Sequence, residues 1–130
     1  EGITLAIKDI HVPNTSNTLI IEGAGGLMVP LNYKETMLDL IKILNAEVIL
    51  VVRNYLGSIN HTLLSVSALN NAGIKVAGIV YSGISNPASE KAIAKFCNYP
   101  VIARIAEEND FAQAIISRYA NGCKSALLSL

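Results

Sequence analysis

The stretch LIIEGAGGLMVPL, residues 19–31, decides the fold that we predict for this chain. Its apolar start, residues 19–21, has no polar alternation, which is typical of a strand buried on both faces of a parallel sheet. The run ends at Glu22, and three glycines follow within four positions. Because ligands bind outside the carboxyl ends of such strands, we expect a strand over residues 18–22 and a binding site directly after it.

The glycine-rich loop suits an anion. Glycine permits positive φ and has no Cβ, so the backbone N–H groups of residues 23–26 can approach a phosphate closely. Glu22 beside these donors favours Mg²⁺, since magnesium prefers oxygen ligands and usually takes one or two carboxylates. The alternative interpretation is a plain turn with a solvated glutamate, because G-A-G-G alone is also a common turn sequence.

Strands and helices alternate along the rest of the chain. Further strands are predicted over 48–52, buried on both faces, over 76–81, and briefly over 101–102. The predicted helices are one of about ten residues starting at Thr36, one with Ser58 as N-cap and Gly73 as its end, 88–96 with Asn86 as cap, and 110–119 burying Phe111 and Ile115. Residues 3–12 fit neither template. This alternation predicts a single α/β domain over 1–130, a three-layer doubly wound parallel sheet.

The second candidate site follows the strand over 48–52. The motif YLGSINH, residues 55–61, turns the chain into a helix whose free N–H groups face the ligand edge of the sheet, where an anion binds favourably. Asn60 would add a side-chain donor, whereas the alternative is that Ser58 and Asn60 only cap the helix. His61 lies in the first turn, where a charged imidazole is unfavourable, so a neutral donor or a surface residue is expected rather than a general base. Together with Glu22 and Ser82, these residues should converge on one edge of the sheet.

Composition narrows the class of protein. Hydrophobic residues make up 52% of the chain, and ten basic residues balance ten acidic ones, so neither nucleic acid nor an anionic membrane is an expected partner. The longest apolar run, 48–52, is too short for a membrane helix, and no leader pattern opens the chain, so a cytoplasmic protein is expected. Cys97 and Cys123 have no metal-ligand spacing, which favours two reduced thiols.

Three motifs carry a resemblance to a known family. EGAGGLMVPLN at 22–32, YLGSINHTLLS at 55–65 and AGIVYSG at 77–83 resemble dethiobiotin synthetase, and the resemblance extends over essentially the whole chain. It implies a P-loop NTPase-like (Rossmann-like) topology and a homodimeric ligase. Members of that family close the ureido ring of dethiobiotin from 7,8-diaminopelargonic acid, CO2 and ATP with Mg²⁺, through a carbamate that ATP phosphorylates.

The resemblance also implies an incomplete site. The family opens with the P-loop G-x-x-x-x-G-K-T, a lysine and an aspartate, which these 130 residues do not contain. The chain therefore resembles the C-terminal part of the enzyme. We expect it to be inactive alone and to need a P-loop-bearing N-terminal half. The alternative is a non-catalytic module that pairs with a complete partner subunit.

The family's site residues carry over by motif. Glu22 matches the glutamate that binds magnesium. The residues implied to line the nucleotide are Glu22, Gly23, Ala24, Gly25, Ser82, Gly83, Ala106, Glu107 and Glu108. Those implied to hold the substrate carboxylate, across a dimer interface, are Gly57, Ser58, Ile59, Asn60 and His61. Ser82 stands where the family commonly has an adenine-reading asparagine, and a proline expected near Ala106 is absent, so selectivity for the base is expected to differ.

Overall fold

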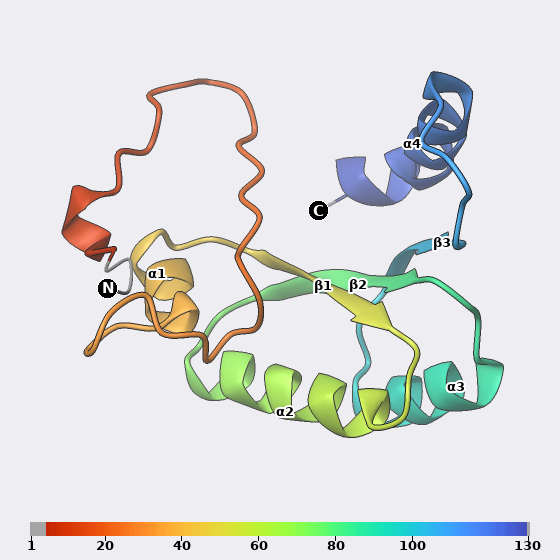
Figure 1. Ribbon diagram of the computed structural model, residues 1–130, viewed down its shortest axis with the longest axis horizontal. Helices are drawn as coiled ribbons and strands as arrows, with labels where there is room; N and C mark the ends of the chain where they lie inside the picture. The colour runs from red at the N-terminus through yellow and green to blue at the C-terminus, as the bar shows by residue number, and fades with distance from the viewer. Residues whose placement is uncertain (1–4, 130) are drawn as a thin grey trace. The chain divides into compact units, whose positions relative to one another are not determined.

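The computed structural model describes residues 5–129 (Figure 1). Contacts within the chain divide it into two compact units, Glu1–Ala46 and Glu47–Leu130. Each unit has its own internal hydrogen bonds and its own buried side chains.

The described part of the first unit contains two short helices. The 3-10 helix η1 (Ile7–Asp9) is tied to the later loop where the Ile7 N–H donates to the Glu35 carboxylate at 3.3 Å. Helix α1 (Met37–Ile43) begins after Thr36, as predicted, but is shorter than the expected ten residues. The backbone N–H and the hydroxyl of Thr36 both donate to Asp39 at 2.7 Å, and these bonds lower the pKa of the Asp39 carboxyl.

The prediction of a strand over residues 18–22 is wrong. These residues form no regular element, and Ile20 is 88% exposed. A parallel strand is held by hydrogen bonds to neighbouring strands, and an apolar run of three residues encodes only the tendency to be buried, not a partner. The sheet in the described part of the chain pairs three later segments instead.

The second unit contains a parallel sheet of three strands in the order β1-β2-β3. The strands are β1 (Val48–Arg53), β2 (Val76–Ser82) and β3 (Val101–Ile105). Helix α2 (Ser58–Asn71) connects the first two strands and α3 (Pro87–Phe96) the last two, so the α/β fold with parallel strands is confirmed. Figure 1 shows α2 and α3 together on one side of the sheet, with α4 (Gln113–Leu128) next to β3 on the other side.

The core lies between the sheet and helices α2 and α3. Alternate residues of β1 and β2 face these helices, and the buried cluster comprises Val52, Val66, Ile79, Tyr81, Ile93 and Cys97. Each aliphatic side chain buried in this way stabilises the fold by about 1.5–3 kcal/mol. Gly78 lets β2 and β3 approach, because a Cβ there would lie 2.8 Å from the Ile102 side chain.

The ends of α2 and α3 follow their sequence signals closely. At the end of α2, Gly73 has φ of 71° and donates to the Asn70 carbonyl at 3.0 Å, while Ile74 donates to the Leu69 carbonyl at 2.9 Å. This is the Schellman pattern that the glycine predicted. At the start of α3, the Asn86 side chain accepts from the Ser89 N–H at 3.1 Å, and Pro87 occupies the first helical position as expected.

Four expectations about the second unit need correction. Strand β1 is not buried on both faces, since Val51 is 64% exposed and, in the described residues, β1 is an edge strand that pairs only with β2. Strand β3 is longer than residues 101–102, because its pairing with β2 continues to Ile105. Helix α4 starts later and ends later than 110–119, and Phe111 lies before it and is exposed.

Candidate functional site

The carboxyl ends of the three strands lie side by side. Arg53 at the end of β1 is paired with Ser82 at the end of β2, and Ser82 is paired with Ile105 at the end of β3. The segments that leave the strands therefore start from one edge of the sheet, which is where ligands bind in parallel α/β folds. The predicted site residues of the second unit all lie at, or shortly after, these strand ends. They are residues 57–61, 82–83 and 106–108.

A cleft of about 350 Å³ opens at the ends of β2 and β3. Its walls include Gly83 and Ile84 after β2, Ala106 and Glu107 after β3, and Arg104 within β3. This volume is at the lower end of the range for small-molecule pockets. The cleft thus brings together three residues of the predicted nucleotide set, Gly83, Ala106 and Glu107.

Gly83 shapes the floor of this cleft. Its φ of 85° is in the left-handed region that glycine tolerates, and its N–H donates to the Ile105 carbonyl at 2.8 Å. A Cβ at this position would lie 3.5 Å from Nε of Arg53. The glycine therefore lets the chain turn out of β2 while it stays bonded to the end of β3.

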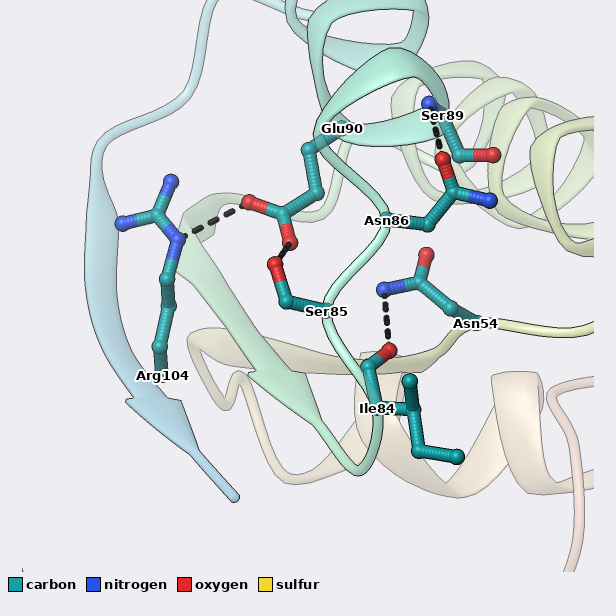
Figure 2. A network of polar contacts seen from close by, with 7 residues as sticks. All are labelled: Asn54, Ile84, Ser85, Asn86, Ser89, Glu90 and Arg104. Atoms are coloured by element: carbon teal, nitrogen blue, oxygen red, sulfur yellow. Dashed lines mark hydrogen bonds and ion pairs between the residues drawn. The ribbon is translucent and has the colours of Figure 1, made fainter. Parts of the chain in front are cut away.

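A polar network fixes the side of the cleft formed by α3 and β3. The Glu90 side chain is only 9% exposed, and its carboxylate accepts from Nε of Arg104 at 2.8 Å and from the Ser85 hydroxyl at 3.2 Å (Figure 2). The Arg104 guanidinium lies 5.6 Å from the centroid of the Tyr81 ring and is 59% exposed. Burial, followed by the negative charge of Glu90, raises the pKa of the Tyr81 hydroxyl, so Tyr81 stays neutral at physiological pH.

Asn54 joins the exits of β1 and β2. Its Nδ2 donates to the Ile84 carbonyl at 3.1 Å, as Figure 2 shows. Its Oδ1 is buried and accepts no hydrogen bond from residues 5–129. The amide holds the two loops at a fixed spacing.

The loop after β3 is held by helix α4. The Ala106 N–H donates to the Tyr119 hydroxyl at 3.0 Å, and that hydroxyl donates in turn to Glu108. Arg118 pairs with Glu108 at 2.6 Å, and Arg53 pairs with Glu107 at 3.2 Å. Because both carboxylates have cationic partners, the negative charge of this loop is balanced within the second unit.

The start of α2 differs from the prediction in one respect. Gly57, with φ of 98°, is the N-cap, and Ser58 is the first helical residue and is buried. The Ser58 N–H donates to the Tyr55 carbonyl at 3.0 Å, which closes a turn that needs positive φ at Gly57. In the described residues, no side chain caps the helix, and the N–H groups of Ile59 and Asn60 have no acceptor.

The glycine-rich loop belongs to the first unit. Glu22 is exposed and forms no hydrogen bond or ion pair with the rest of residues 5–129. Gly25 has φ of 77°, and a Cβ there would lie 2.8 Å from the Val29 side chain. The loop then folds back on α1, where the Leu38 N–H donates to the Leu27 carbonyl at 2.9 Å. This geometry requires glycine at position 25.

Several residues of the site were missed by the sequence analysis. Glu90, Arg104 and Asn54 line the cleft, yet none of them was a candidate. Glu90 in the first turn of a helix and Arg104 near a strand end are common surface patterns. Only the fold brings these two residues, 14 positions apart, into contact.

Among residues 5–129, no three side chains of His, Cys, Asp or Glu cluster in a way that could hold a metal ion by themselves. None of the helices in that range is both long and apolar enough to cross a bilayer. Both cysteines there, Cys97 and Cys123, are free thiols.

Known proteins match this chain over most of its length. The AAA domain family matches residues 1–114. The ATP-dependent dethiobiotin synthetase BioD of Christiangramia forsetii is 49% identical over 130 residues, which are 100% of this chain and 62% of that protein. The enzyme of the same name from Cytophaga hutchinsonii is 45% identical over 121 residues, 92% of this chain and 59% of that protein.

A further group of relatives matches a shorter segment. The ATP-dependent dethiobiotin synthetase BioD of Brucella ovis is 45% identical over 94 residues, 72% of this chain and 44% of that protein. The chain therefore spans less than two thirds of the length of each of these relatives.

Proposed function

Because this chain belongs to the AAA domain family and is a relative of ATP-dependent dethiobiotin synthetases, we propose that it carries part of the active site of such a ligase. The proposed reaction closes the ureido ring of dethiobiotin from 7,8-diaminopelargonic acid, CO2 and ATP. The observation that carries the proposal is the open start of α2 at the ligand edge of the sheet. All 130 residues of the chain that contains this helix match a synthetase.

The start of α2 is assigned to the carboxylate of diaminopelargonic acid. The N–H groups of Ile59 and Asn60 have no acceptor in the described residues, and the N-terminus of a helix carries partial positive charge. The Asn60 side chain is exposed beside them and can donate a further hydrogen bond. Three further residues complete this site. They are Gly57, Ser58, which forms the buried base of the turn, and His61, whose ring is exposed.

The cleft after β2 and β3 is assigned to the base of ATP. Gly83, Ala106 and Glu107 line it, with Ser82 and Glu108 next to them in the chain. Ser82 offers one hydroxyl where an asparagine would offer both a donor and an acceptor, so we expect weaker selectivity for adenine. The donor edge of Arg104 faces the same cleft and favours a base with acceptor atoms.

The glycine-rich loop is assigned to phosphate and Mg²⁺. An exposed carboxylate without a cationic partner in the described residues, followed by a loop of free N–H groups, fits a hard ion that takes oxygen ligands. Glu22 would hold the ion, and Gly23, Ala24 and Gly25 would line the phosphates. When bound, magnesium supplies positive charge that balances the transferring phosphoryl group.

The proposal includes the surroundings of the enzyme. We propose that the chain acts as a homodimer in the cytoplasm, as the family resemblance implies. We also propose that it needs a P-loop-bearing N-terminal half, because phosphoryl transfer depends on cationic groups that glycines cannot replace. The second candidate function is a non-catalytic module that pairs with a complete partner subunit.

The test is reconstitution. The purified chain is incubated with diaminopelargonate, bicarbonate and magnesium-ATP, alone and mixed with the P-loop-bearing half of the Christiangramia forsetii relative, and dethiobiotin is measured by mass spectrometry. We expect product only in the mixture. Product from the chain alone would overturn the incomplete-site proposal. An inactive mixture, with the two halves of the relative active together, would favour the non-catalytic module.

Two substitutions test the assigned residues in the active mixture. Asn60→Ala should raise KM for diaminopelargonate roughly tenfold to a hundredfold and leave KM for ATP unchanged, because a hydrogen bond to a charged group contributes about 1.5–3 kcal/mol. Asn71→Ala, at the other end of α2, is the control.

Glu22→Gln should abolish magnesium-dependent turnover without changing the melting temperature, while Glu47→Gln, an exposed carboxylate before β1, should change neither.

A further inference from the structure

Tyr55 and His61 form a polar pair across the turn that leads into α2. The Tyr55 hydroxyl lies 2.6 Å from Nδ1 of His61, and the two ring centroids are 5.7 Å apart with the planes tilted by 37°. The backbone of Tyr55 is held by the turn from Tyr55 to Ser58. The backbone of His61 is held by its N–H, which donates to the Gly57 carbonyl at 3.0 Å. Both side chains are therefore attached to backbone that is itself hydrogen-bonded.

This pairing selects one form of the imidazole. The ring of a neutral histidine has one N–H and one acceptor nitrogen, and the hydrogen bond that one nitrogen makes decides where the proton is. The phenol is a stronger acid than neutral imidazole, and the imidazole nitrogen is the better acceptor. The Tyr55 hydroxyl therefore donates to Nδ1, and the proton of His61 is on Nε2.

The same contact fixes where the ring lies. A Cβ built on Gly57 would be 3.6 Å from Cε1 of His61 and 3.9 Å from Nδ1, so the imidazole covers the N-cap residue. Because the Tyr55 hydroxyl bonds to Nδ1, the Nε2–H group of the same ring is left available as a donor. His61 is in the first turn of α2, the same turn that contains the open N–H groups of Ile59 and Asn60.

We propose that Tyr55 is a positioning residue, which holds His61 as the Nε2–H tautomer so that its imidazole can donate to the carboxylate bound at the start of α2. This inference rests on the proposed function only for the identity of the carboxylate. The hydrogen bond and the tautomer belong to the chain itself and can be measured without turnover.

The first test is spectroscopic and uses the purified full chain. Long-range proton–nitrogen spectra report which ring nitrogen carries the proton, and His11, the second histidine of the chain, is the internal control. We expect His61 to show an unprotonated Nδ1 in the wild type and a mixture of tautomers in Tyr55→Phe, while His11 is unchanged. Tyr99→Phe is the matched variant, because its hydroxyl bonds to Asn70 at the opposite end of the same helix, and it should leave His61 unchanged. An unaltered His61 spectrum in Tyr55→Phe would overturn the proposal.

The second test is kinetic and uses the reconstituted mixture. Tyr55→Phe should raise KM for diaminopelargonate about threefold to tenfold, with kcat and KM for ATP unchanged, because one oriented neutral donor is lost. If Asn60→Ala raises this KM and Tyr55→Phe does not, the positioning role is wrong and the carboxylate site stands. If neither variant raises KM, the carboxylate assignment of the proposed function fails as well.

Discussion

At the scale of single residues, Glu90 and Arg104 differ in what each would lose without the other. Glu90 is nearly buried, and burying a carboxylate is costly unless donors compensate for the lost water. Arg104 and Ser85 supply these donors. Arg104 is more than half exposed, so its own charge stays hydrated whether or not Glu90 is present. The pair is thus more important for the carboxylate than for the guanidinium.

This asymmetry predicts unequal effects of two substitutions. Arg104→Met should destabilise the chain by about 1–3 kcal/mol, because it leaves a buried carboxylate with one hydroxyl partner. Glu90→Gln should change the free energy of unfolding by less than about 1 kcal/mol, because it leaves only an exposed cation. Urea unfolding of both variants measures the difference. Equal losses would contradict the asymmetry.

Cys97 predicts how stability depends on pH. Burial raises the pKa of its thiol, so the folded chain keeps the proton more strongly than the unfolded chain does. Stability from the neutral thiol is therefore fully present below about pH 8.5, the usual pKa of cysteine, and is lost as the pH rises further. The melting temperature should fall between pH 8 and 10, and the fall should be smaller in Cys97→Ala. Cys123→Ala, which alters a half-buried thiol outside the core, should retain the full decline.

At the scale of elements, the cap of α3 is the clearest local determinant. Asn86→Ala should lower the free energy of unfolding by about 0.5–2 kcal/mol, because the Ser89 N–H loses its acceptor. Asn86→Asp keeps an acceptor oxygen and should preserve stability. Urea midpoints followed by circular dichroism compare the two. A loss of the same size in both variants would show that the side chain stabilises the helix start in another way.

The sequence predicted elements where a local signal was sufficient. The strands near Val48 and Val76 and the helices capped near Gly57 and Asn86 follow from continuous apolar runs and cap residues, which are read within a few positions. Residues 19–21 have the same apolar signature but form no strand, because pairing depends on distant segments. Helix α4 continues past Tyr119, its predicted end, and through Gly122 to Leu128, because the helix-forming residues around this glycine outweigh a cost of about 1 kcal/mol.

The candidate site shows the same division. Gly83 could be predicted because it follows a predicted strand and the end of a parallel strand marks the ligand edge, whereas Ala106 was implied only by the family resemblance. Glu90 reaches the cleft from the helix that comes next, and Tyr119 reaches it from α4. Their contributions depend on packing between elements, which a single sequence does not display.

At the scale of the whole molecule, the two units differ in how their backbone is protected. Residues 11–26 are exposed and lie outside helices and strands, whereas β2 is almost entirely buried. Exposed backbone without regular hydrogen bonds is where proteases cut first. Dilute proteinase K should therefore cleave within residues 11–26 before it cleaves β2 or α2. Mass spectrometry of the early products identifies the site, and a first cut inside α2 would contradict this ranking.

The order of the strands in the sheet has a consequence for gene architecture. Strands β1, β2 and β3 are neighbours in space in the same order as in the chain, so the sheet uses one continuous stretch of polypeptide. A reading frame interrupted anywhere before Glu47 would keep every pairing of this sheet on one product. The same property makes the boundary at Ala46 a natural place to divide this chain into two separately expressed pieces.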